Sequence, residues 1–132
     1  MSRGADEVQL PEDLRYGPEH EWSRIDADGS VTIGITDFAQ DQLGDVEFLD
    51  LPEVGATLTR GEPMAEVEST KAASDIFAPV SGEVIEVNSD LVAQPKKINS
   101  DPYGAWLVRV RPSDPAELDT LISAAEYQRS LE

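Results

Sequence analysis

The chain has 132 residues, of which 39% are hydrophobic and 28% are charged, and its formal net charge is −17 at pH 7. This length suits one domain with a modest core and excludes a large multidomain enzyme. The acidic balance excludes binding to nucleic-acid backbones and anionic membrane surfaces, and the absence of cysteine excludes disulfides, thiolate metal sites and a cysteine nucleophile. No apolar run approaches the roughly 20 residues of a membrane helix.

Residues 1–13 mix acids with Gly4 and Pro11 and show no hydrophobic period. They are predicted to be a flexible acidic lead-in, and residues 14–132 a single domain. Because this segment has no apolar signal core and Arg3 is its one base, it does not resemble a secretory or mitochondrial presequence. A cytoplasmic location is therefore expected.

Two segments alternate with the period of a strand. Val31, Ile33 and Ile35 interleave with smaller or polar residues, and the same holds for residues 46–51, so both are predicted to be half-buried strands. A short helix is predicted near 37–43, with Thr36 or Asp37 as its N-cap and Gly44 at its end.

After Pro52, short apolar stretches are separated by turns rich in glycine and proline, and residues 106–110 resemble a closing strand. This spacing predicts a mainly β fold, a flattened barrel or sandwich of two small sheets. Trp22 and Trp106 are expected to anchor the core, while a lone histidine, His20, does not suggest a metal site.

A C-terminal helix is predicted near 115–128. Asp114 can cap it, Pro115 suits its first turn, and Glu117 lies three residues after the cap. The residues expected on one face, which we predict to pack against the sheets, are Leu118, Leu121, Ile122 and Ala125.

Lys71 stands apart from the other two lysines, Lys96 and Lys97. It lies between two predicted strands, and the acids near it are Glu66, Glu68 and Asp75. A tight hairpin there would project the amine into solvent, and its small neighbours, Ser69, Thr70 and Ala72, would let another protein close over it. Taken alone, this pattern fits a carrier lysine or merely an exposed turn lysine.

The motifs that resolve this ambiguity extend over the chain from His20 to Tyr127. They are His20-Glu21-Trp22, Gly34-Ile35-Thr36-Asp37, Leu43-Gly44-Asp45, Leu51-Pro52-Glu53-Val54-Gly55, Val67-Glu68-Ser69, Lys71-Ala72, Ser74-Asp75, Ala78-Pro79-Val80-Ser81-Gly82-Glu83-Val84, Val87-Asn88, Ile98-Asn99, Asp101-Pro102-Tyr103-Gly104 and Trp106-Leu107. In this order and spacing the sequence resembles the glycine cleavage H proteins, within the lipoyl and biotinyl carrier superfamily.

The resemblance implies a non-catalytic carrier with lipoic acid joined to Lys71 by an amide. Its implied partners are the pyridoxal-phosphate glycine decarboxylase (P protein), the aminomethyltransferase (T protein), dihydrolipoyl dehydrogenase (L protein) and lipoate-attaching enzymes. The carrier would shuttle the aminomethyl group of glycine between the first two and its reduced arm to the third. A monomer is expected, because a permanent interface would hinder access to the tip.

By the same resemblance, Glu21 and Asp75 are the residues expected to line a cleft where the loaded arm is shielded from water. Glu68, Ser69, Thr70 and Ala72 are the further recognition candidates. The acids near Lys71 are hypothesised to favour the loaded arm, which carries an ammonium. Phe38 stands where the family often has tyrosine or histidine, so a histidine role there does not transfer.

A biotin carrier typically brackets its lysine with methionines, whereas Thr70 and Ala72 flank Lys71. The lipoyl domains of 2-oxo acid dehydrogenases usually lack the C-terminal extension. An enzyme is disfavoured because no set of catalytic side chains converges in the sequence. A lipoyl relay or scaffold that serves other proteins stays open, since the sequence does not separate it from the glycine cleavage role.

Overall fold

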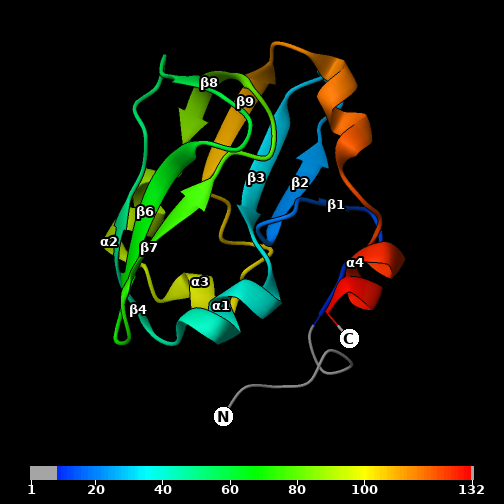
Figure 1. Ribbon diagram of the computed structural model, residues 1–132. Coiled ribbons are helices and arrows are strands. Elements are labelled where there is room, and N and C mark those ends of the chain that lie inside the picture. Colours follow the sequence, from blue (N-terminus) through cyan, green and yellow to red (C-terminus); the bar gives the residue numbers. More distant parts are fainter. Residues whose placement is uncertain (1–8, 132) are drawn as a thin grey trace.

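The computed structural model describes residues 9–131, which form two antiparallel sheets (Figure 1). The larger sheet has the spatial order β1 (Arg15–Tyr16), β2 (Glu21–Ile25), β3 (Val31–Ile35), β9 (Val108–Pro112), β8 (Gly82–Val87) and β5 (Thr57–Leu58). The smaller sheet has the order β4 (Val46–Asp50), β6 (Pro63–Ser69) and β7 (Ala73–Phe77). The mainly β prediction is confirmed, as an open sandwich rather than a closed barrel.

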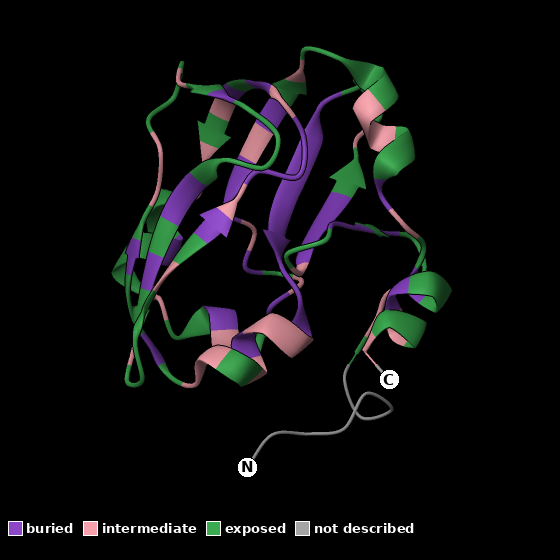
Figure 2. Cartoon of the chain, in the orientation of Figure 1, coloured by how far each residue is buried: buried purple, intermediate pink, exposed green. Residues whose placement is uncertain are grey.

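The main core lies between the two sheets, where the inward residues of both are buried (Figure 2). The central strand β3 is buried along its whole length, so the prediction that it is half-buried was wrong. Thr32 is satisfied by a 2.7 Å hydrogen bond to Asp26. Gly34 is covered by the indole of Trp22, because a Cβ on Gly34 would lie 2.5 Å from that ring.

Strand β4 departs from the predicted alternation. Its pairing with β6 shifts between Val46 and Phe48, which marks a β-bulge. As a result Val46 and Leu49 are buried, whereas the Phe48 side chain is 49% exposed. The bulge therefore exposes Phe48 to solvent. In a regular strand Phe48 would lie on the same face as Val46.

Helix α1 (Asp37–Leu43) confirms the predicted short helix. The Thr36 hydroxyl caps it by accepting the Ala39 N–H at 3.1 Å, and Gly44 ends it at φ 77°. Two further short helices were not predicted, α2 (Ser89–Ala93) and α3 (Lys97–Ser100).

The predicted C-terminal helix is two short helices. A 3₁₀-helix (Pro115–Thr120) and α4 (Ala124–Ser130) are separated by residues 121–123, because the Ile122 backbone pairs with Tyr16 in extended conformation. Ser123 then caps α4 in a reciprocal arrangement with Glu126. The break shifts the packing face, so Leu121 is buried as expected, whereas Ala125 is exposed.

The two ends of the described chain meet in a second, smaller core. Its buried members are Leu14, Tyr16, Trp22, Ala124 and Tyr127, while Trp106 is only half-buried against it. The described part of the predicted lead-in contacts the domain, since the Gln9 N–H donates to Asp37 at 2.8 Å and the Pro11 carbonyl accepts from Tyr16 at 2.7 Å. Residues 1–8 of the predicted lead-in lie outside the described residues. Within 9–131, each helix is too short or too polar to cross a membrane.

Candidate functional site

Lys71 lies in the tight turn between β6 and β7, as predicted. Ser69 and Ala72 close the turn through a 3.0 Å backbone hydrogen bond, leaving Thr70 and Lys71 at its centre. The Ser69 hydroxyl accepts the N–H groups of Lys71 and Ala72 at 3.2 and 3.3 Å. Ser69 thus builds the turn that exposes Lys71.

The tip of this hairpin rests on the loop that leaves α1. The Thr70 N–H donates to the Asp45 carbonyl at 3.0 Å, and the Lys71 amine lies 3.4 Å from the Gln42 carbonyl near the C-terminal end of the helix. A Cβ on Gly44 would lie 3.2 Å from Cε of Lys71, so glycine leaves room for the lysine stem. The carbonyls at a helix C-terminus carry partial negative charge, which favours a cation there.

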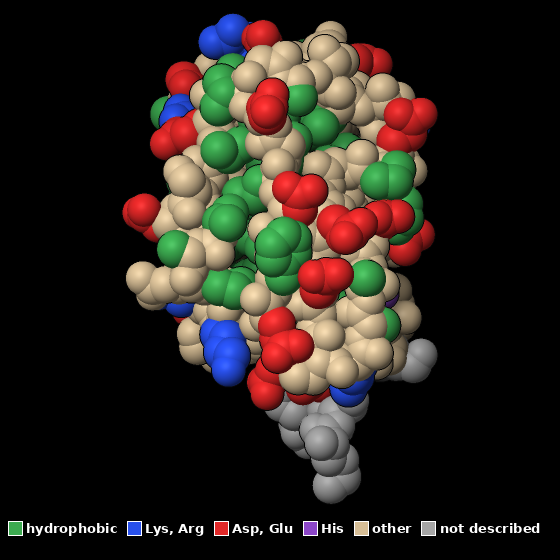
Figure 3. All heavy atoms as spheres, turned by 90° about the vertical axis from the view of Figure 1, so that its left-hand side faces the viewer, with side chains coloured by type: hydrophobic (Ala, Val, Ile, Leu, Met, Phe, Trp, Pro, Cys, Tyr) green, Lys and Arg blue, Asp and Glu red, His purple; other side chains and the backbone are tan. Residues whose placement is uncertain are grey.

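The acids near Lys71 form no ion pair with it within residues 9–131. Glu66 lies opposite Asp75 across the β6–β7 pair and opposite Asp50 across the β4–β6 pair, while Glu68 faces Phe48. On this side of the molecule acidic side chains surround hydrophobic ones (Figure 3). Like charges directly opposite each other are destabilising, so a cation brought to this sheet would be attracted.

A cleft of about 460 Å³ lies between α1 and the smaller sheet; we call it the α1 cleft. Its apolar lining residues are Ile35, Phe38, Ala39, Leu43, Val67 and Ile76, and its polar ones are Glu19, His20, Gln42, Ser74 and Asp75. Gln42, whose carbonyl accepts from the Lys71 amine, also lines the cleft, so the cleft begins beside that amine.

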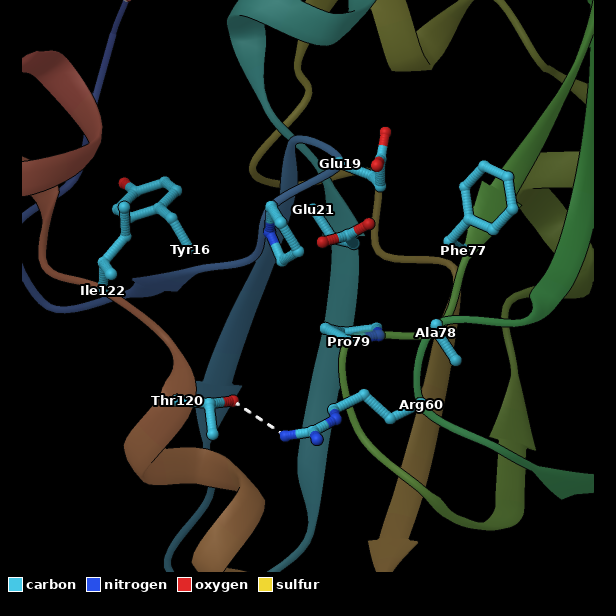
Figure 4. A pocket seen from close by; sticks show the side chains of 11 residues that line it. Tyr16, Glu19, Glu21, Arg60, Phe77, Ala78, Pro79, Thr120 and Ile122 are labelled. Atoms are coloured by element: carbon cyan, nitrogen blue, oxygen red, sulfur yellow. Dashed lines mark hydrogen bonds between the residues drawn. The ribbon is translucent and has the colours of Figure 1, made fainter. Parts of the chain in front are cut away.

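Glu21 lines a neighbouring cavity of about 370 Å³, the Glu21 pocket (Figure 4). The side chain is only 1% exposed, and its Oε1 atom has no hydrogen-bond partner. Burial raises the pKa of Glu21 to about 7. Arg60, in the same pocket, donates instead to Thr120 at 3.3 Å. Glu21 therefore forms no ion pair within residues 9–131, although Arg60 lines the same pocket.

The structure places the two predicted cleft residues on adjoining cavities rather than on one. Asp75 lines the α1 cleft and Glu21 its own pocket, and Glu19 lines both. The recognition candidates Glu68, Thr70 and Ala72 are exposed around the tip.

Two further residues of the α1 cleft were not predicted, His20 and Phe38. Their rings pack at 4.9 Å between centroids, and His20 also contacts Tyr127 of α4. The partner Tyr127 is 107 residues away in the chain, so no local pattern indicates it. The His20-Glu21-Trp22 motif was the only signal in that region.

This arrangement can hold a long apolar chain attached to the Lys71 amine, because the cleft beside that amine has apolar walls. The acids that line the cleft, Glu19 and Asp75, can bind a cation at the end of such a chain. Within residues 9–131 there is no group of three or more side chains suited to hold a metal ion.

Comparison with known proteins agrees with this geometry. A family model described as "Glycine cleavage H-protein" matches residues 14–132. The chain is 53% identical over 123 residues to the glycine cleavage system H protein 2 of Pseudomonas aeruginosa, covering 93% of this chain and 95% of that protein. It is 52% identical over 124 residues to the glycine cleavage system H protein of Escherichia coli O7:K1, covering 93% and 96%. The crystal structure of a glycine cleavage system H protein from Mycobacterium marinum is similar, with a TM-score of 0.84 and 46% identity, covering 92% of this chain and 98% of that one.

Proposed function

Because this chain belongs to the glycine cleavage H-protein family, we propose that it is the lipoyl carrier of the glycine cleavage system and that Lys71 is its attachment residue. One observation carries the assignment: the Lys71 amine is exposed on a tight hairpin and contacts the carbonyl of Gln42, a residue that lines the apolar α1 cleft. Lys96 and Lys97 are exposed too, but they lie at the start of α3 rather than in a hairpin.

The residues around Lys71 fit an amide-linked lipoyl group. Forming the amide replaces the charged amine, which has three N–H bonds, by a neutral amide nitrogen with one N–H, and this N–H can still donate to the Gln42 carbonyl. Gln42 would thereby aim the attached chain along α1. When bound, lipoic acid supplies the dithiolane that this cysteine-free chain lacks, on which the aminomethyl group of glycine is carried.

Asp75 and Glu21 are proposed to hold the loaded arm at rest. The aminomethyl group brings an ammonium, and Asp75 in the α1 cleft offers it a carboxylate. Glu21 offers a second carboxyl group, whose Oε1 atom is buried without a hydrogen-bond partner, in the adjoining pocket beyond Glu19. An arm resting there is surrounded by apolar side chains that exclude water from its labile end.

The proposed partners are the P, T and L proteins of the system and the enzymes that attach lipoate. Each must reach the hairpin tip, where Thr70, Lys71 and Ala72 are exposed. Glu68 lies just behind the tip and is a candidate for recognition by basic side chains of these enzymes. The carrier contributes binding and protection, and its partners contribute the chemistry.

The attachment site is tested by intact mass after expression with a lipoylating system. We expect a lipoyl-sized increment in the wild type and in Lys96→Arg, a control lysine outside the hairpin, and no increment in Lys71→Arg. An increment that persists in Lys71→Arg would falsify the assignment of Lys71.

The resting position is tested by the release of formaldehyde from the loaded protein. Asp75→Asn should speed release, because the ammonium loses a carboxylate partner in the cleft. Asp50→Asn is the matched control, since it removes the same charge from the same sheet, opposite Glu66, without lining the α1 cleft. Equal rates in the wild type and Asp75→Asn would contradict the resting position.

A further inference from the structure

His20 has a strained backbone. Its φ of 69° is the only positive value at a non-glycine residue within 9–131, and L-residues rarely adopt such a conformation. Two backbone hydrogen bonds hold it, from the His20 N–H to the Gly17 carbonyl at 3.3 Å and from the Thr36 N–H to the His20 carbonyl at 3.0 Å. Strain of this kind persists only where the surrounding structure fixes it, and here it turns the imidazole toward α1 and α4.

The imidazole is held by a chain of hydroxyl groups. Nδ1 of His20 lies 2.7 Å from the Tyr127 hydroxyl, which lies 2.8 Å from the Thr36 hydroxyl. The Thr36 oxygen already accepts the Ala39 N–H as the cap of α1. The Tyr127 ring is itself fixed, because it stacks on Tyr16 at 4.8 Å with an interplanar angle of 8°.

Two directions of this chain fit the distances, because a hydroxyl oxygen can accept two hydrogen bonds. In one, Nδ1–H of His20 donates to Tyr127 and Tyr127 donates to Thr36. In the other, Thr36 donates to the Tyr127 oxygen and Tyr127 donates to Nδ1 of His20, so that the imidazole is neutral with its proton on Nε2. Burial of the ring, which lowers the pKa of His20, favours a neutral imidazole, while the neighbouring Glu19 opposes it.

The charge of His20 matters because of what faces it. The ring lines the α1 cleft together with two acids, Glu19 and Asp75, and Glu21 lies next to it in the chain. A protonated imidazole would compete with an incoming ammonium for these carboxylates. A neutral imidazole, packed on Phe38, leaves the carboxylates to the ammonium and adds an aromatic wall.

We propose that Tyr127 is a positioning residue that holds the His20 ring neutral and fixed as a wall of the α1 cleft, so that helix α4 controls how well the cleft retains a cationic arm. The retention step rests on the proposed carrier function. The hydrogen-bond chain itself is a property of the unmodified protein and can be tested without a lipoyl group.

The first test uses nitrogen NMR, because His20 is the single histidine of the chain. In the full-length wild type we expect the Nε2-protonated tautomer, with Nδ1 shifted as a hydrogen-bond acceptor. Tyr127→Phe keeps the stack on Tyr16 but removes the donor, so the tautomers should mix and the pKa of His20 should rise. Tyr16→Phe is the matched control, since the Tyr16 hydroxyl donates to the Pro11 carbonyl instead. A wild-type tautomer and pKa in Tyr127→Phe would overturn the proposal.

The second test measures formaldehyde release from the loaded variants. Tyr127→Phe and His20→Ala should speed release about fivefold, the effect of one lost hydrogen bond. The ratio of the release rate of Tyr127→Phe to that of the wild type should grow as the pH falls from about 8 to about 6, because a histidine without this hydrogen bond gains its proton in that range. His20→Ala should lack this dependence. All variants should still be lipoylated at Lys71, with thermal unfolding confirming that each is folded.

The outcomes separate the two proposals. If Asp75→Asn speeds release and Tyr127→Phe does not, the role of Tyr127 is wrong and the carrier function stands. If neither variant changes release, the resting position in the α1 cleft is wrong as well. If the lipoyl mass is absent from Lys71, the carrier assignment itself fails.

Discussion

The Lys71 hairpin and the Glu21 pocket differ in how their functional groups are held. Lys71 is exposed in a turn closed by Ser69 and Ala72 and by one contact with Gln42. Glu21 is 1% exposed, and its Oε1 atom has no hydrogen-bond partner. Lys71 remains in contact with water, so its charge adds little cost to folding. Glu21 is buried, so its charged form makes folding less favourable.

The difference fits the roles proposed for the two regions. A lysine that several enzymes are proposed to modify or visit has to remain accessible, and its turn is built from short local hydrogen bonds. A group proposed to hold a cation must be in place before the cation arrives, and burial of an unpartnered oxygen achieves this at the expense of stability. Removing the hydrogen bonds of the Lys71 turn should therefore lower stability, whereas removing the buried acid Glu21 should raise it.

The largest effect is expected from Glu21→Gln. The pKa of Glu21 is about 7 in the folded state, above its ordinary value of 4.5. Folded Glu21 therefore keeps its proton between these pH values while the unfolded chain loses it, so stability falls as the pH rises through that window. The full penalty, about 3 kcal/mol, is present above pH 7 and absent below pH 4.5.

Glu21→Gln should remove that penalty, because the amide stays neutral at every pH. Denaturant unfolding at pH 4.5 and pH 8 should show the variant more stable than the wild type only at the higher pH. Glu53→Gln, at an exposed position, is the control and should leave the pH profile unchanged. A variant that follows the wild-type profile would refute the view that Glu21 is a buried, uncompensated acid.

Gly17→Ala should destabilise the Glu21 pocket by about 2 kcal/mol through overpacking. The new Cβ would lie 1.9 Å from Oε1 of Glu21 and 3.3 Å from Pro79. The cost should shrink in a Glu21→Ala background, where most of the clash is gone. Chemical denaturation of the four proteins gives the coupling, and strictly additive effects would show that Gly17 does not shape the position of Glu21.

Gly44→Ala should cost about 1–3 kcal/mol, because its φ of 77° and ψ of −162° lie in a region essentially restricted to glycine, with a smaller addition from crowding the Lys71 stem. Gly29→Ala is the matched control, because Gly29 has a similar φ of 86° but no heavy atom within 4 Å of the new Cβ. The excess of Gly44→Ala over Gly29→Ala should vanish in a Lys71→Ala background. If the extra destabilisation remains in that background, crowding of the Lys71 stem is not its cause.

Ser69→Ala should have the smallest effect on global stability, below about 1 kcal/mol, because the turn is exposed. It should nevertheless slow lipoylation, since the hydroxyl accepts the N–H groups of Lys71 and Ala72. The initial rate with a lipoate-attaching enzyme measures this, with Ser89→Ala at the start of α2 as a control. Unchanged lipoylation would mean that the backbone alone fixes the tip.

The features that could be predicted from the sequence are those set by nearby residues. The cap at Thr36, the end of α1 at Gly44 and the hairpin at Lys71 each depend on residues within a few positions, and all three were confirmed. The signals for these features are backbone preferences and short hydrogen bonds.

The features that were missed depend on distant segments. Helix α4 is separated from the 3₁₀-helix because Ile122 pairs with Tyr16, and both faces of β3 are buried because Trp22 covers Gly34. The bulge in β4 depends on its pairing with β6. The wall of the α1 cleft likewise requires Tyr127 to meet His20, which alternation and capping rules cannot indicate.

The contact between His20 and Tyr127 also sets an order in biosynthesis. A chain leaves the ribosome N-terminus first at about 5–20 residues per second, and these two residues are 107 positions apart. The Lys71 hairpin can close once Phe77 has emerged, whereas the His20 ring finds its partner only after α4 has been made. Under the proposed carrier function, a nascent chain would therefore display Lys71 before the contact between His20 and Tyr127 exists.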